Sequence, residues 1–178
     1  MTAFVTSLIL ALLVGIVAST DTEALFFAVR QDNESLIQDE LNKGADINDI
    51  GPGGQTPLMH AVLQGRETSV QFLLSKGADV TTGEKDGYTP MHGAGFQGRS
   101  VIAKQLLDHG LDPLIPHEDG FLPMPRSCWG REDRHTATVQ VFLEAGVPFD
   151  IKSKDGKTCM EMAQNPATIE LLKYRANI

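Results

Sequence analysis

One spacing runs through this chain and limits it to a narrow class of folds. Gly54, Gly87 and Gly120 follow one another at intervals of 33 residues, and Gly156 follows after 36. Four further columns keep the same intervals, namely Gly44, Gly77, Gly110 and Gly146; Leu41, Leu74, Leu107 and Leu143; Leu58, Met91, Met124 and Met160; and Ala61, Ala94, Ser127 and Ala163. A fixed period of this length is the signature of a repeat array, in which neighbouring units bury one another's apolar faces. The chain is therefore predicted to form a solenoid.

Each unit is predicted to contain a turn followed by two helices. Thr89-Pro90 is typical of a helix start, because threonine can cap the first turn and proline suits the first helical position. A short first helix with small residues follows and stops at a glycine such as Gly98. The second helix carries apolar residues at helical spacing, as at Val70 and Leu73, and ends at a glycine such as Gly77.

The turns and helix ends of these units resemble the ankyrin repeat. The segments that carry the resemblance are Gly54-Gln55-Thr56-Pro57-Leu58, Asp86-Gly87-Tyr88-Thr89-Pro90-Met91-His92, Gly44-Ala45-Asp46-Ile47-Asn48 and Gly77-Ala78-Asp79-Val80. The resemblance extends from about Asp21 to the C-terminus. It implies an all-α repeat solenoid, in which helix–turn–helix units stack and are joined by β-hairpin-like turns. It also implies that His92 makes structural hydrogen bonds to the turns.

Five units are expected in an ankyrin repeat domain over residues 20–178. An N-terminal cap is predicted at about 21–50, full units at 51–83, 84–116 and 117–152, and a C-terminal cap at 153–178. The third full unit departs most from the pattern, since Leu122-Pro123-Met124-Pro125 lacks the capping hydroxyl. Its three extra residues are expected between its helices, within 130–135.

The first nineteen residues differ in character from the rest. They contain no charged side chain, and residues 8–18 form an unbroken apolar run of eleven. A run of this length fits the hydrophobic region of a secretory signal peptide better than a bilayer span, which needs about 20 residues. We expect residues 1–19 to be removed near Thr20, giving a secreted or lumenal protein. The alternative is a membrane-tethered scaffold that keeps residues 4–19 as an anchor helix.

Two further features bear on a secretory route. Asn33-Glu34-Ser35 is an acceptor sequence for N-glycosylation, which makes Asn33 a candidate modification site.

The two cysteines, Cys128 and Cys159, could form a disulfide. In the repeat register, however, they lie about five positions apart on neighbouring first helices. That offset adds about 7 Å to a lateral spacing of about 10 Å, beyond the reach of a bridge. Both are therefore expected to be small buried residues, with a disulfide as the alternative.

The sequence offers little for catalysis, cofactors or nucleic acid. A formal net charge of −8 argues against a nucleic-acid binder. No histidine or cysteine has a partner at zinc-binding spacing, so neither a metal nor a cofactor is predicted. The remaining enzyme hypothesis is a thiolate at Cys128, because Arg126, Arg131 and His135 follow or precede it closely. Its place in a small-residue column favours burial, and the chain is predicted not to be an enzyme.

The resemblance implies that a protein or peptide binds on the concave face, formed by the turns and the edge of the first helices. The residues placed there by position are Gln55, Tyr88, Phe121 and Lys157 after the turn glycines, and Leu63, Gln64, Phe96, Gln97 and Trp129 before the first-helix stops. The aromatic residues among them are predicted to form one groove, because aromatic side chains are frequent interface hot spots. Glu84, Asp86, Glu118 and Asp119 would give this groove an acidic rim, suited to an apolar anchor flanked by basic residues. The alternatives are aromatic packing within each turn and self-association through the same patch.

Overall fold

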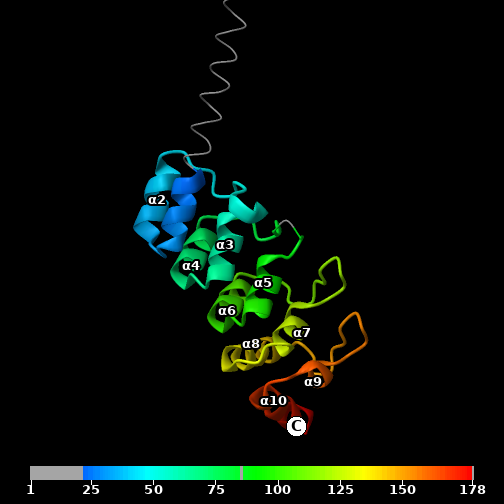
Figure 1. The fold of residues 1–178 in the computed structure, drawn as a ribbon. Coiled ribbons are helices and arrows are strands. Elements are labelled where there is room, and N and C mark those ends of the chain that lie inside the picture. Colours follow the sequence, from blue (N-terminus) through cyan, green and yellow to red (C-terminus); the bar gives the residue numbers. More distant parts are fainter. Residues whose placement is uncertain (1–21, 85, 178) are drawn as a thin grey trace, which may run out of the picture.

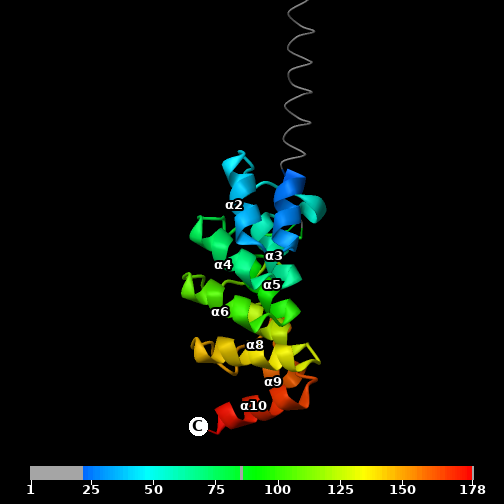
Figure 2. The same ribbon diagram turned by 90° about the vertical axis from the view of Figure 1, so that its left-hand side faces the viewer.

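The computed structural model describes residues 22–84 and 86–177. Helix pairs follow one another along an elongated stack, with the N-terminal and C-terminal pairs at opposite ends (Figures 1 and 2). The first pair is a helix over residues 22–30 and α2 (Glu34–Asn42); α3 (Pro57–Gln64) pairs with α4 (Glu67–Ser75), α5 (Pro90–Gln97) with α6 (Ser100–Asp108), α7 (Pro123–Cys128) with α8 (Asp133–Glu144), and α9 (Cys159–Met162) with α10 (Pro166–Ala176). The all-α solenoid predicted from the sequence is confirmed.

The connections between pairs project to one side of the stack, beside the first helices (Figure 1). They are hairpin-like turns without named strands in the described residues. One of them starts with a short 3-10 helix (Pro52–Gly54), and another carries an isolated antiparallel bridge between Lys152 and Thr158. We call the surface formed by the turns at 51–55, 83–88, 116–121 and 152–157 and the adjoining first helices the hairpin face.

Local chemistry explains where the helices begin and end. The Thr56 hydroxyl accepts a hydrogen bond from the backbone N–H of Met59 (3.2 Å), and Pro57 occupies the first helical position. The same helix stops at Gly65, whose φ of 69° is the left-handed conformation that glycine adopts without steric cost. At the start of α7 the capping residue is Leu122, which makes no side-chain hydrogen bond. The third full unit therefore lacks this cap, as its sequence predicts.

A continuous apolar core lies between the helices, from Leu25 in the first pair to Leu172 in the last. Small residues allow the first helices to approach closely, and Ala61, Ala94 and Ser127 are fully buried. The described residues contain no helix that is both long and apolar enough to cross a membrane.

The expected position of the three extra residues is wrong. They lie inside the second helix of the third full unit and not between its helices. The helix α8 has 12 residues, whereas α4 and α6 have 9 each. Three residues are close to one helical turn of 3.6 residues, so the longer helix keeps its apolar face toward the core. Phe142 and Leu143, near the C-terminal end of α8, are buried there.

The expectation that the cysteines stay apart is also wrong, because Cys128 and Cys159 form a disulfide with their Cα atoms 5.5 Å apart. The sequence-based estimate placed equivalent positions of neighbouring first helices side by side. The helices are instead shifted, so that the sixth residue of one approaches the first residue of the next. The preceding pair shows the same shift, since a Cβ atom on Gly95, sixth in α5, would collide with the carbonyl oxygen of Pro123, first in α7.

Candidate partner-binding face

A small pocket lies on the hairpin face, between the middle units of the stack. Its volume is about 200 Å³, below the roughly 300–1,000 Å³ that is typical of sites for small-molecule ligands. Its lining residues are Leu63, Glu84, Tyr88, His92, Gly93, Phe96 and Arg126. Three residues that the sequence places on the binding face, Leu63, Tyr88 and Phe96, therefore come together in this pocket. Its size suits one amino-acid side chain better than a cofactor.

Phe96 is the most exposed of the predicted aromatic residues. It lies near the C-terminal end of α5, and 55% of its surface remains accessible to solvent. A large exposed aromatic ring next to a pocket is typical of an interface, where such residues often dominate binding energy.

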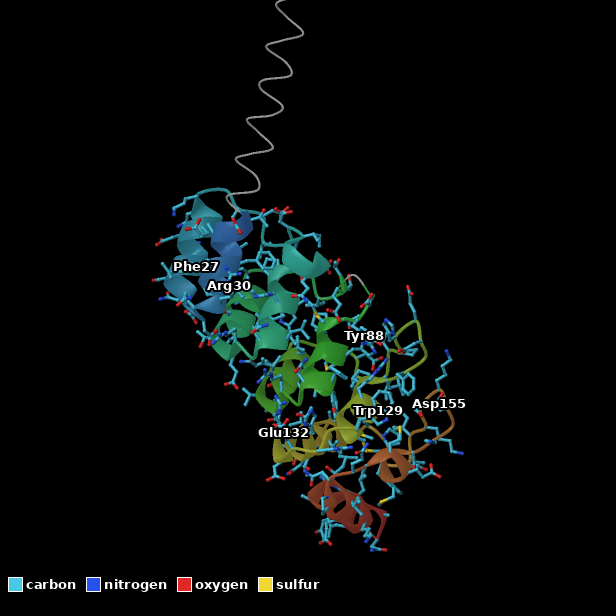
Figure 3. All side chains as sticks on the ribbon, in the orientation of Figure 1. Phe27, Arg30, Tyr88, Trp129, Glu132 and Asp155 are labelled. Carbon is cyan, nitrogen blue, oxygen red and sulfur yellow. A yellow bond between two sulfur atoms is a disulfide. The ribbon has the colours of Figure 1, made fainter. Side chains whose placement is uncertain are left out.

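The other three aromatic residues of the predicted groove surround a buried arginine. The guanidinium carbon of Arg126 lies 4.8 Å from the ring centroid of Tyr88, 4.7 Å from that of Phe121 and 5.1 Å from that of Trp129. Figure 3 shows Tyr88 and Trp129 on the side of the stack where the hairpin turns project. Cations are attracted to the faces of aromatic rings, so these contacts stabilise the charge of Arg126. The groove is thus lined partly by residues with internal packing roles.

Asp119 neutralises this arginine. One Arg126 nitrogen donates hydrogen bonds to the Asp119 carboxylate and to the Tyr88 hydroxyl oxygen (2.6 Å), and the Tyr88 hydroxyl donates to the same carboxylate (2.9 Å). Burial alone would raise the pKa of Asp119, but the Phe121 N–H, His117, Tyr88 and the charge of Arg126 together hold it well below its usual value. Asp119 therefore stays ionised. Its charge pairs with Arg126 and contributes less to the predicted acidic rim than the sequence suggests.

Two histidines join neighbouring turns. His92 is buried, with its Nδ1 atom 2.8 Å from the Thr89 hydroxyl and its Nε2 atom 3.2 Å from the Phe121 carbonyl oxygen. Because a carbonyl can only accept, the neutral ring donates from Nε2 and accepts at Nδ1. Burial lowers the pKa of His92 to about 4, so the ring is neutral at physiological pH. The ring of His117 stacks on the ring of Tyr88, with their centroids 3.9 Å apart. The Nε2 atom of His117 lies 2.8 Å from the carbonyl oxygen of Asp86.

The remaining predicted residues lie around the pocket or further along the face. The Gln55 amide donates to Glu84 (3.4 Å), and its oxygen lies 3.1 Å from His60 Nδ1. Gln64 and Lys157 are exposed, whereas Gln97 is half-buried. The structure thus places Gln55 beside the pocket and Lys157 on the last turn, away from it.

Three residues that line the pocket, His92, Gly93 and Arg126, are not among those that the sequence places on the binding face. Gly93 and Arg126 both occupy the fourth position of a first helix, and at α5 and α7 this position faces the pocket. In the sequence, Arg126 stands out only as a neighbour of Cys128.

The enzyme hypothesis that uses a thiolate at Cys128 is wrong. Cys128 is fully buried and bonded to Cys159, so it offers no thiolate. Within residues 22–84 and 86–177, no group of three or more histidine, cysteine or acidic side chains is placed to hold a metal ion.

The comparisons with known proteins agree with the repeat pattern. A family model described as ankyrin repeats in three copies matches the chain over residues 6–82 and 25–117. No curated protein matches the chain.

Proposed function

Because the chain belongs to the ankyrin-repeat family, whose stacked repeats form protein–protein interaction modules, we propose that its hairpin face binds a protein or peptide and has no catalytic role. The main support is the pairing of the exposed Phe96 ring with the adjoining pocket. An apolar ring beside a cavity of side-chain size can hold an apolar anchor of a partner.

The charges around the pocket favour a partner with basic residues. Glu84 lines the pocket, and Asp86 and Glu118 are exposed on the neighbouring turns. Opposite charges at the edge of an interface raise the rate of association more than its final strength. Binding is therefore expected to weaken as salt concentration rises.

A matched pair of exposed apolar residues in one unit tests this proposal. Phe96 lies on α5 at the hairpin face, and Val101, 48% exposed, lies on α6. The full chain and its Phe96→Ser and Val101→Ser variants would be immobilised and incubated with extracts of the natural source. Proteins retained by the parent and Val101→Ser, but lost with Phe96→Ser, would support the hairpin face. Equal retention by all three would contradict it, and a doubled solution mass without other proteins would indicate self-association.

We also propose that the chain enters the secretory pathway and functions outside the cell or in a lumen. The buried disulfide supports this location, because disulfides persist in oxidising compartments. The predicted cleavage near Thr20 lies outside the described residues. The intact mass of the natural protein tests it: a chain beginning near Thr20 agrees with secretion, whereas retention of residues 1–19 favours the membrane-tethered scaffold.

The same route makes Asn33 a site for an N-linked glycan. Asn33 is exposed and caps α2, with its Oδ1 atom accepting from the Leu36 N–H (3.1 Å). A glycan attaches to the side-chain nitrogen, so the cap and the modification use different atoms. Asn33→Asp keeps a good capping residue and removes the acceptor. Protein secreted from eukaryotic cells should lose mass on enzymatic deglycosylation, and Asn33→Asp should not.

A further inference from the structure

The fourth residue of each first helix forms a column along the stack. In α3, α5, α7 and α9 its members are His60, Gly93, Arg126 and Met162. Three of these four residues have long side chains, and only Gly93 has none. Gly93 lines the pocket on the hairpin face. Leu63 from the preceding unit and Arg126 from the following unit line the same pocket.

The backbone does not require glycine at position 93. The residue lies inside α5 and is not among the glycines with positive φ. A Cβ atom there would meet the Cε atom of Met59 at 2.9 Å, the Cδ2 atom of Leu63 at 3.3 Å and the Cγ1 atom of Val62 at 3.4 Å, all of them side-chain atoms and none of them backbone. Glycine in a helix interior is less stable than alanine, so this position gives up helix propensity, and a larger residue would have to displace the Met59 side chain.

Gly95, two residues further on, has a different reason to be small. A Cβ atom there would collide with the backbone carbonyl oxygen of Pro123, which cannot move without shifting α7. Gly95 is thus fixed by a backbone contact between units, whereas Gly93 is buried against side chains and forms part of the pocket's inner wall.

We propose that the space at Gly93 receives one bulky apolar side chain of the partner, such as leucine, methionine or phenylalanine, followed or preceded by lysine or arginine. This inference rests on the proposed binding role of the hairpin face. The rings of Tyr88 and Phe96 and the Leu63 side chain give the pocket apolar walls. Asp119 already pairs with Arg126, so the arginine does not call for an acidic ligand. Glu84 supplies the charge that a basic neighbour of the anchor would meet.

Selection from a random peptide library displayed on phage tests this specificity with a defined probe. The full chain is expected to select peptides that carry a bulky apolar residue next to lysine or arginine. Gly93→Met should fill the pocket and weaken the selected peptides at least tenfold, with an unchanged helical signal. Glu84→Gln should weaken the same peptides severalfold and reduce the salt dependence of their binding.

Three further variants separate a loss of binding from a loss of folding. Gly93→Ala should melt at a higher temperature than Gly95→Ala, because the added Cβ atom meets only side chains at position 93 but meets the backbone at position 95. If Gly93→Met does not fold, Leu63→Trp fills the pocket from the opposite wall and should give the same loss of binding. Selection of peptides with an acidic anchor that depends on Arg126 would overturn the proposed chemistry.

The outcomes separate this inference from the proposed function. Selected peptides that bind Gly93→Met and the parent equally, but lose binding with Phe96→Ser, would overturn the role of Gly93 and leave the hairpin face as the binding surface. Peptides that tolerate all of these substitutions, or a selection that yields no binders, would contradict both.

Discussion

Cys128 lies against Cys159 as the sixth residue of one first helix against the first residue of the next, with their Cα atoms 5.5 Å apart. Gly95 and Pro123 hold the same two positions in the preceding pair of units and are also in close approach. The disulfide therefore uses a contact that recurs between neighbouring units.

A new disulfide should form at the equivalent positions two units before the native one, between α3 and α5. Val62 is sixth in α3 and Pro90 is first in α5, so Val62→Cys with Pro90→Cys should bridge without added oxidant beyond air. Thiol counting in denaturant, before and after reduction, measures the bridge. The control pair Ala61→Cys with Ala94→Cys holds equivalent positions and should stay reduced. A bridge in the control pair alone would show that the units are not shifted in this way.

The native disulfide is expected to hold the C-terminal pair of helices to the stack. It closes a loop across a sequence separation of 31 residues, for which the loss of chain entropy in the unfolded state corresponds to about 3–4 kcal/mol. Reduction, or Cys159→Ser, should therefore lower the melting temperature and broaden the transition, since α9 and α10 have a neighbour on one side only. Thermal melts with and without a dithiol reductant provide the measurement. Identical melts, together with two reactive thiols in the untreated unfolded protein, would show that the bridge is absent.

The Arg126–Asp119 pair should show strong energetic coupling. Asp119→Asn removes the charge that Arg126 contacts and should lower the free energy of unfolding by about 2 kcal/mol, the size expected for a hydrogen bond between charged groups. Arg126→Met keeps part of the contact with the aromatic rings and removes the charge. The double variant should lose less stability than the two single variants combined, because each single change leaves one partner behind. Urea unfolding of the four proteins measures the coupling, and additive losses would contradict it.

His92 should make the protein less stable in mild acid. The unfolded ring has a pKa near 6.5, and burial lowers the pKa of the folded ring to about 4. As pH falls from about 6.5 to about 4, the unfolded state binds more protons, so the free energy of unfolding falls, by about 3 kcal/mol for this shift. His92→Gln should lose less stability over the same range. His60 also has a lowered pKa because of burial, but its contribution is common to both proteins. Parallel curves for the two proteins would assign the acid sensitivity elsewhere.

The sequence predicts the fold well because the repeat columns carry it. Thr56, Pro57 and Gly65 set the limits of α3 through local chemistry that is visible in the residue types alone. The shift between neighbouring first helices depends on how closely their backbones approach, which no single column reveals. For that reason the disulfide was missed. The extra turn of α8 was also missed, because three added residues fit a loop and a helix equally well in the sequence.

The candidate site was predicted in part for a similar reason. Leu63, Tyr88 and Phe96 could be placed by their positions in the repeat, and they line the pocket. Phe121 and Trp129 could be placed on the same face, but their contact with Arg126 depends on side-chain directions. Gly93 carries no side chain, so its place in the pocket wall is visible only in the structure.

Site-specific photo-crosslinking tests the binding role of the hairpin face most directly. A benzoylphenylalanine would replace Phe96 in one protein and Val101 in another, since both positions are exposed in the same unit. After illumination in extracts or secretions of the natural source, the chain labelled at position 96 should form one discrete cross-linked product that high salt reduces. The chain labelled at position 101 should form none. A product at position 101 and none at position 96 would contradict the assignment of the hairpin face as the binding surface.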